Sequence, residues 1–164
     1  MKKSVIILVL LLLTFASQAK AGVYISEIMY DYEGTDTDYE WVELANDGGS
    51  DVNISGWKFN DGSNHNLNTP PTNGSTGSLV VPANGFLILA SNASSFNSLY
   101  NLSESVIDTV MSMNNTTETI SILDSNSSTI DSVSFSSADG ANGDGKTLQL
   151  VSGSWVSEIG RAHV

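Results

Sequence analysis

Apolar residues in this chain occur in short bursts separated by glycine, asparagine, aspartate and serine. Such spacing is typical of short β-strands joined by turns, and a succession of them indicates a β-sandwich. The bursts that predict strands are residues 23–30, 40–46, 52–59, 78–81, 86–90, 118–124, 129–135 and 147–151. We therefore expect an all-β protein, an immunoglobulin-like β-sandwich of about eight strands.

Two of these segments show which of their faces are covered. In the second strand Val42 and Leu44 share one face, and Trp41 and Glu43 share the other, because side chains alternate along a strand. Segment 86–90 is apolar at every position, as expected for a strand that is covered on both faces.

Two further features interrupt the alternation. Ile54 and Trp57 are three residues apart, and a bulge at Gly56 would bring both to the inner face, where Trp57 joins the core. After residue 90 the pattern predicts one short helix, with Asn92 as its N-cap. Phe96, Leu99 and Tyr100 are expected on one side of this helix.

The N-terminal residues have the organisation of a secretory signal peptide. Two lysines precede the apolar run 5–15, and the small residues at Ala19 and Ala21 suit signal peptidase. The run is shorter than the roughly 20 apolar residues of a membrane span. We expect residues 1–21 to be removed, with cleavage after Ala19 as the alternative, and no transmembrane segment afterwards. The expected location is secreted, extracellular or in the cell envelope.

The other end departs from the strand pattern. The stretch "IGRAHV", residues 159–164, is expected to be a non-native tail, an assembly artefact. On this interpretation residues 22–158 form the domain, and the natural protein continues beyond Glu158.

The charge of the expected domain is strongly negative. All 18 acidic residues lie within 22–158, where Lys58 and Lys146 are the only basic residues, so the net charge is 2 − 18 = −16. Binding to nucleic acid depends on basic residues that neutralise phosphates, so we expect no nucleic-acid partner. An anionic membrane surface is disfavoured for the same reason. Cysteine is absent, so no disulfide supports the fold.

The usual catalytic groups are sparse. His65 is the only histidine of the expected domain, no G-x-S-x-G motif occurs, and one imidazole is too few for zinc. We expect His65 to be a solvent-facing loop residue. Glu27, Glu40 and Glu43 lie on neighbouring strands and could form a carboxylate pair, but acids on the solvent face of a strand are ordinary. The sequence therefore predicts no catalytic residues.

The stretch 29–44 is rich in acidic residues that could bind calcium. Calcium takes six to eight oxygen ligands, often from alternating acidic residues in a loop. A second acidic loop, "DGANGDG" at 139–145, offers further oxygen ligands, but neither loop has the EF-hand register. A solvated acidic loop is the favoured interpretation. The calcium candidates are Asp31, Glu33, Asp36, Asp38 and Glu40.

Aromatic residues gather in the same part of the sequence. Tyr32, Tyr39 and Trp41 could form a contact surface for sugar rings or for a protein partner. The alternative is that they fill the core, and Trp41 is the least certain of the three.

Taken in order, the bursts resemble a known family. They are "ISEIMYD", "EWVELAN", "ISGWKFND", "VPANGFLILA", "ETISILDSNSSTIDSVSF", "GANGDGKTLQL" and "GSWV". Together they are similar to the lamin-tail domain of the prokaryotic exported type, over residues 23–156. The resemblance implies an immunoglobulin-like sandwich that is not an enzyme and has no catalytic residues to carry over. Prokaryotic members accompany exported hydrolases or belong to surface proteins.

The expected function is an extracellular binding or tethering module with an unknown protein or glycan partner, and a part of a longer exported protein. One alternative is the N-terminal accessory domain of a secreted phosphoesterase or nuclease. Another is a calcium-dependent adhesion or glycan-binding module. No cofactor is expected, with calcium left open.

Overall fold

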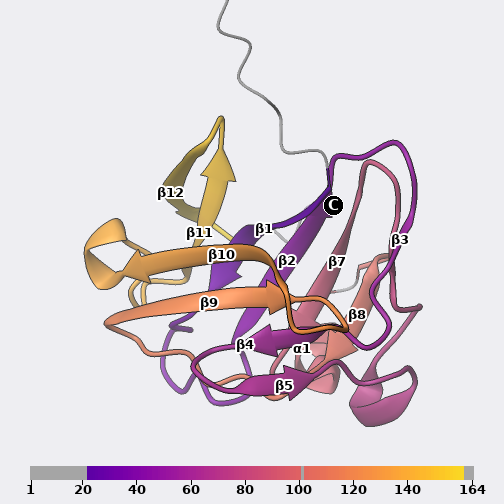
Figure 1. Cartoon of the computed structure of the whole chain (residues 1–164). Helices are drawn as coiled ribbons and strands as arrows, with labels where there is room; N and C mark the ends of the chain where they lie inside the picture. The colour runs from indigo at the N-terminus through magenta and orange to yellow at the C-terminus, as the bar shows by residue number, and fades with distance from the viewer. Residues whose placement is uncertain (1–21, 101, 161–164) are drawn as a thin grey trace, which may run out of the picture.

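The structure, a computed structural model, describes residues 22–100 and 102–160, which form two stacked β-sheets (Figure 1). The larger sheet has the order β12-β11-β1-β2-β7-β8. Its strands are β12 (Ser154–Ile159), β11 (Lys146–Val151), β1 (Val23–Met29), β2 (Trp41–Asn46), β7 (Gly85–Ala90) and β8 (Ser105–Asp108). Neighbouring strands are antiparallel except β7 and β8, which are parallel.

The smaller sheet has the order β10-β9-β4-β5. Its strands are β10 (Thr129–Ser136), β9 (Thr117–Leu123), β4 (Lys58–Asn60) and β5 (Asn64–Asn66). The short strands β3 (Val52–Asn53) and β6 (Val80–Val81) pair with each other. The helical elements are α1 (Ala93–Leu99) and the 3-10 turns η1 (Thr72–Gly74) and η2 (Ser137–Asp139).

The main core lies between the two sheets. Alternate apolar side chains of both sheets meet there and are removed from water, which is the main stabilising term of a sandwich. Its largest fully buried members are Tyr30, Phe59, Ile25, Ile28, Leu44, Ile54, Leu87, Leu89 and Ile107. Trp57 is half-buried and packs against this core.

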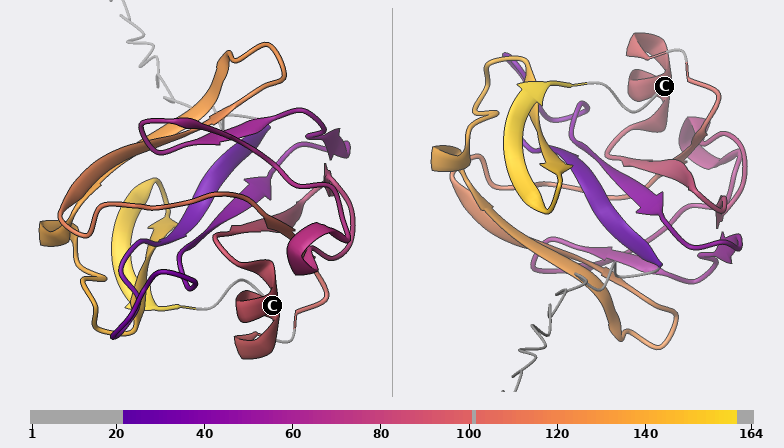
Figure 2. Two further views of the ribbon diagram at one scale, coloured as in Figure 1. Left: turned by 90° about the horizontal axis from the view of Figure 1, so that it is seen from below. Right: turned by 90° about the horizontal axis from the view of Figure 1, so that it is seen from above.

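A second apolar cluster lies on the outer face of the larger sheet, where α1 covers β2 and β7. Phe96 and Ala93 of α1 pack there against Trp41 and Ile88. Figure 2 shows the larger sheet between the smaller sheet on one side and α1 on the other. Both faces of β2 and of most of β7 are therefore buried, which the continuous apolar run predicted for β7 and the sequence did not predict for β2.

The sequence predicted the fold class correctly: the molecule is an immunoglobulin-like, all-β sandwich with one short helix. The described residues hold twelve strands rather than about eight. The additional strands are mostly two to four residues long, too short for an alternating pattern to be recognised.

Three local predictions can be compared with the structure. Gly56 does not form a bulge: the backbone N–H of Trp57 donates to the carbonyl oxygen of Ile54 at 3.0 Å, closing a turn in which Gly56 has φ +78°. The Asn92 N-cap is confirmed, since its Oδ1 accepts from the Ser95 N–H at 3.0 Å. Leu99, expected beside Phe96, is 48% exposed.

The expected signal peptide, residues 1–21, lies outside the described residues, as do residues 161–164 of the expected tail. Ile159 belongs to β12, where it is paired with Lys146 of β11. Across the described part of the chain, no helix has the length and apolarity needed to span a membrane.

Candidate functional site

The parallel strands β7 and β8 place two chain segments at one edge of the larger sheet. Ala90 and Asp108 end these strands opposite each other, and the Thr109 N–H donates to the Ala90 carbonyl at 3.0 Å. Because parallel strands end at the same edge, the residues that follow them, Ser91 and Thr109, come together. The candidate site is built at this edge.

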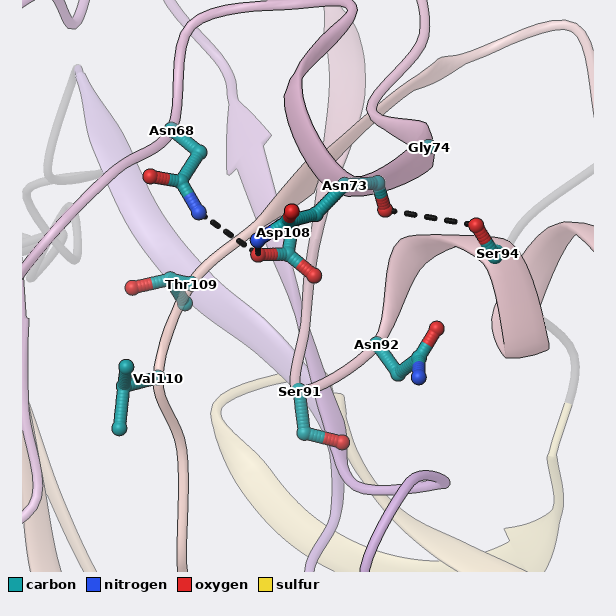
Figure 3. A pocket seen from close by; sticks show the side chains of 9 residues that line it. All are labelled: Asn68, Asn73, Gly74, Ser91, Asn92, Ser94, Asp108, Thr109 and Val110. Carbon is teal, nitrogen blue, oxygen red and sulfur yellow. Dashed lines mark hydrogen bonds between the residues drawn. The ribbon is translucent and has the colours of Figure 1, made fainter.

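Asp108 lies at the centre of the site and is 6% exposed. Its Oδ1 accepts from the side-chain amides of Asn68 at 2.6 Å and Asn73 at 3.0 Å (Figure 3). Its Oδ2 accepts from the backbone N–H of Ala93 at 3.3 Å. The loop after β5, the turn η1 and the start of α1 are thus all attached to one carboxylate, which fixes their relative positions.

An open pocket of about 530 Å³ surrounds these groups. Figure 3 shows side chains that reach it from the loop after β5, from η1, from the start of α1 and from the ends of β7 and β8. The lining is polar, and Val110, which is 64% exposed, is its one large apolar side chain. The nine lining residues are Asn68, Asn73, Gly74, Ser91, Asn92, Ser94, Asp108, Thr109 and Val110.

The lining holds polar atoms that Asp108 does not engage. The hydroxyl oxygen of Ser91 is buried and has no hydrogen-bond partner among the described residues. The amides of Asn68 and Asn73 give their nitrogens to Asp108, so their oxygens are directed away from that carboxylate, as Figure 3 shows for Asn68. The pocket therefore presents both donor and acceptor groups.

A second hollow adjoins this pocket along α1. It has a volume of about 260 Å³ and is lined by Tyr39, Ser94, Ser95, Ser98 and Leu99, so the two share Ser94. The ring of Tyr39 stacks on Tyr32 with 4.7 Å between centroids. Two of the three residues expected in an aromatic contact surface are therefore together, next to the pocket.

Trp41, the third expected surface residue, is in the core. It is 1% exposed and contacts Phe96 edge-on at a centroid distance of 5.6 Å. The sequence placed Trp41 correctly on the face opposite Val42, but it did not show that α1 covers this face. The expectation that Trp41 is a contact residue was wrong for that reason.

The five calcium candidates do not converge on one point. Asn115 bridges Asp31 and Asp36, donating from its Nδ2 at 3.1 and 2.8 Å. Glu33 and Asp38 are exposed, and Asp38 accepts from the Asn92 side chain instead. Within residues 22–100 and 102–160, no group of three or more acidic, histidine or cysteine side chains has the arrangement to hold a metal ion.

Glu40, one of those candidates, is a buried acid rather than a solvated one. It is 4% exposed, and its Oε1 accepts from the Met113 N–H at 2.8 Å. Burial raises the pKa of Glu40 to about 8; the Met113 hydrogen bond lowers it, and nearby Asp36 and Asp61 raise it further. Glu40 therefore holds the 109–116 segment to the start of β2.

Glu27 and Glu43 are also buried, contrary to the expectation of solvent-facing acids. They are directly opposite each other on β1 and β2, and both are 0% exposed. Thr147 Oγ1 donates to Glu27 at 2.5 Å and Ser26 Oγ donates to Glu43 at 2.6 Å. A substrate would have no access to such a pair, so their closeness does not make a catalytic site.

Two other candidate residues have structural roles. His65 lies in β5 rather than in a loop, and its Nε2 is 2.9 Å from Asp61 Oδ1. Asp139, from the second acidic loop, caps η2 by accepting from the Ser136 N–H at 2.7 Å.

The pocket residues Asp108, Asn68 and Asn73 were not identified from the sequence. The segment 105–108 was not predicted as a strand, and Asn68 and Asn73 belong to a loop whose composition is ordinary for a connection. An acid at the end of the apolar run "SVID" was the one available signal, and such acids are common.

The two stacked sheets define an immunoglobulin-like module, and the family match that follows makes it a non-catalytic one. A family model described as the Lamin Tail Domain matches residues 16–137, well over half of the chain. The chain belongs to the lamin-tail domain family, as its ordered motifs indicated. Comparisons with curated proteins and with solved structures gave no match.

Proposed function

We propose that this protein is an exported binding module, which attaches to a partner outside the cytoplasm through the pocket around Asp108. The observation that carries the proposal is the preorganised polar lining: Asp108 holds the nitrogens of the Asn68 and Asn73 amides, which leaves their oxygens for a partner. Groups held in place before binding lose little conformational entropy when a ligand arrives.

The N-terminal sequence supports the extracellular part of this proposal. Two lysines, an apolar run and small residues at Ala19 and Ala21 are the features that direct a chain to export. An all-β domain without cysteine does not depend on disulfide formation after export, so its fold suits an oxidising or a reducing environment.

The charge of the domain restricts the partner. With 18 acidic and two basic residues in 22–158, the surface repels nucleic acids, anionic lipids and other polyanions. We propose a neutral or cationic partner, a glycan or a protein.

Export is tested by expressing the whole chain from Met1 in a bacterial host and sequencing the N-terminus of the exported form. We expect the mature protein to begin at Gly22, or at Lys20 if cleavage follows Ala19. As a control, Leu10→Arg in the apolar run should retain the chain in the cytoplasm. Recovery of the wild-type chain with Met1 intact, in the cytoplasm, would contradict the proposal.

Binding is tested by sedimenting the exported protein with isolated cell envelopes. We expect a saturable fraction to sediment. A fraction that stays bound when salt is raised indicates a neutral partner, and one that salt releases indicates a cationic partner, because salt screens the attraction between opposite charges. A wild-type protein that stays entirely in the supernatant would refute an envelope-binding function.

A further inference from the structure

We propose that the Asp108 pocket is a carbohydrate site that takes a neutral, hydroxyl-rich sugar, with the neighbouring hollow at Tyr39 accommodating the next sugar ring of the same glycan. This inference rests on the proposed binding function and assigns a ligand class to it. The residues that define the site are Asn68, Asn73, Ser91 and Asp108 in the pocket, and Tyr39 in the hollow.

The pocket lining combines amide and hydroxyl groups. A sugar hydroxyl donates one hydrogen bond and accepts others, so a matching site needs both kinds of group close together. The amide oxygens of Asn68 and Asn73 can accept. The Ser91 hydroxyl is buried and has no partner among the described residues, so it can donate or accept once its side chain rotates toward the ligand. A lining of amides and hydroxyls with one large apolar side chain matches a polyhydroxyl ligand and does not match an apolar one.

The charges that line the pocket restrict the ligand further. No lysine or arginine lines the pocket, so a phosphate or sulfate group would meet Asp108 without a counter-charge. A cationic ligand is disfavoured as well, because Asp108 is 6% exposed and already accepts from two amides and the Ala93 N–H. A neutral ligand is the class that remains.

An apolar surface lies beside the polar pocket. A sugar ring has hydroxyls at its edge and C–H groups on its face, and the C–H face packs on aromatic rings. Tyr39 is half-buried and held flat by stacking on Tyr32, and Leu99 beside it is 48% exposed. Because this hollow shares Ser94 with the pocket, consecutive sugars of one chain can contact both.

Affinity gel electrophoresis of the exported whole chain tests the proposal. The probes are neutral polysaccharides cast in the gel, namely dextran, mannan, xyloglucan and a mixed-linkage β-glucan, with heparin as the anionic probe. We expect retardation by at least one neutral polysaccharide and none by heparin.

The pocket is then probed with Asn68→Ala and Ser91→Ala, and the hollow with Tyr39→Ala. Each is expected to weaken retardation by about tenfold, since a sugar hydroxyl or ring face loses its partner. Ser91→Ala distinguishes lost binding from misfolding. The Ser91 hydroxyl bonds to none of the described residues, so its removal should leave the melting temperature unchanged. Asn126→Ala, in the β9–β10 turn of the other sheet, is the matched control and should bind like the wild type.

The outcomes separate this inference from the function on which it rests. Sedimentation with envelopes but no retardation by any neutral polysaccharide would overturn the carbohydrate assignment and leave the binding module standing. Retardation that Asn68→Ala and Ser91→Ala leave unchanged would place the sugar elsewhere and overturn the site. Retardation by heparin alone would overturn the argument from charge. Failure of the envelope experiment itself would count against the proposed function.

Discussion

Asn68 and Asp108, forty residues apart in the chain, are joined twice. The Asn68 side-chain amide donates to Asp108 Oδ1 at 2.6 Å, and its backbone N–H donates to the Asp108 carbonyl at 3.0 Å. These two bonds fix the loop after β5 to the end of β8, and so form one wall of the pocket.

Asp108→Ala should lower the free energy of unfolding by about 2–4 kcal/mol, because two amides and a backbone N–H lose their charged acceptor in a partly buried place. Urea denaturation measures the change. Asp51→Ala is the control: Asp51 accepts one exposed bond, from Ala83, and its loss should cost less than about 1 kcal/mol. Equal effects of the two substitutions would contradict the structural role of Asp108.

Glu40 predicts a pH dependence of stability. Its pKa is raised from 4.5 to about 8 in the folded state, so the folded protein binds more protons than the unfolded one between these values. Stability is therefore greatest below about pH 4.5, as far as Glu40 is concerned, and falls as the pH rises through 8.

Melting temperatures measured from pH 4 to 9 test this dependence. Glu40→Gln can still accept from the Met113 N–H but cannot ionise, so the decline should become shallower. Some slope will remain, since burial also raises the pKa of Glu118 and that of Asp31. A slope identical to that of the wild type would show that Glu40 titrates normally.

Trp41 and Tyr39 should respond differently to truncation. Trp41→Ala empties a fully buried site under α1 and is expected to cost about 3–5 kcal/mol of stability. Tyr39→Ala removes a ring stacked at the surface and should cost about 1 kcal/mol. Chemical denaturation distinguishes the two. A near-neutral Trp41→Ala would mean that α1 does not cover the sheet in solution.

Gly74→Ala should disturb the wall between η1 and α1. Gly74 has φ +83°, and a Cβ there would lie 2.1 Å from Ser94 Oγ and 3.0 Å from the Ser94 backbone nitrogen. The turn must move away from α1, so we expect a destabilisation of about 1–3 kcal/mol. Gly153→Ala, whose added Cβ meets nothing within 4 Å at φ +82°, controls for the strain of the positive φ alone.

The acidic loop gives a prediction about calcium. The loop is expected to be solvated, so titrating calcium into the protein should give no saturable heat and no rise in melting temperature. Among the five calcium candidates, Asp31 and Asp36 are the two that one side chain, the Asn115 amide, holds together. A saturable heat that Asp36→Asn abolishes would overturn this expectation and restore the calcium interpretation.

The expectations from sequence succeeded where one property repeats along a segment. The alternation in β2 showed which of its residues share a face, and the continuous apolar run of β7 indicated a strand covered on both faces, because only buried positions need to be apolar. Asn92 was found because an N-cap needs a particular side chain at one position.

The expectations failed where a segment distant in sequence decides the environment. The neighbouring sequence does not distinguish Glu33, which is exposed, from Glu40, which the segment at Met113 buries. It also does not distinguish Tyr39, at the surface, from Trp41, which α1 covers.

By itself, the sequence determined the sandwich, its family and its negative charge, because these depend on patterns and sums over many residues. Only the tertiary structure decided where the pocket lies. That pocket forms because two parallel strands end together and a loop forty residues away along the chain contacts their edge, a relationship between segments that no single segment encodes.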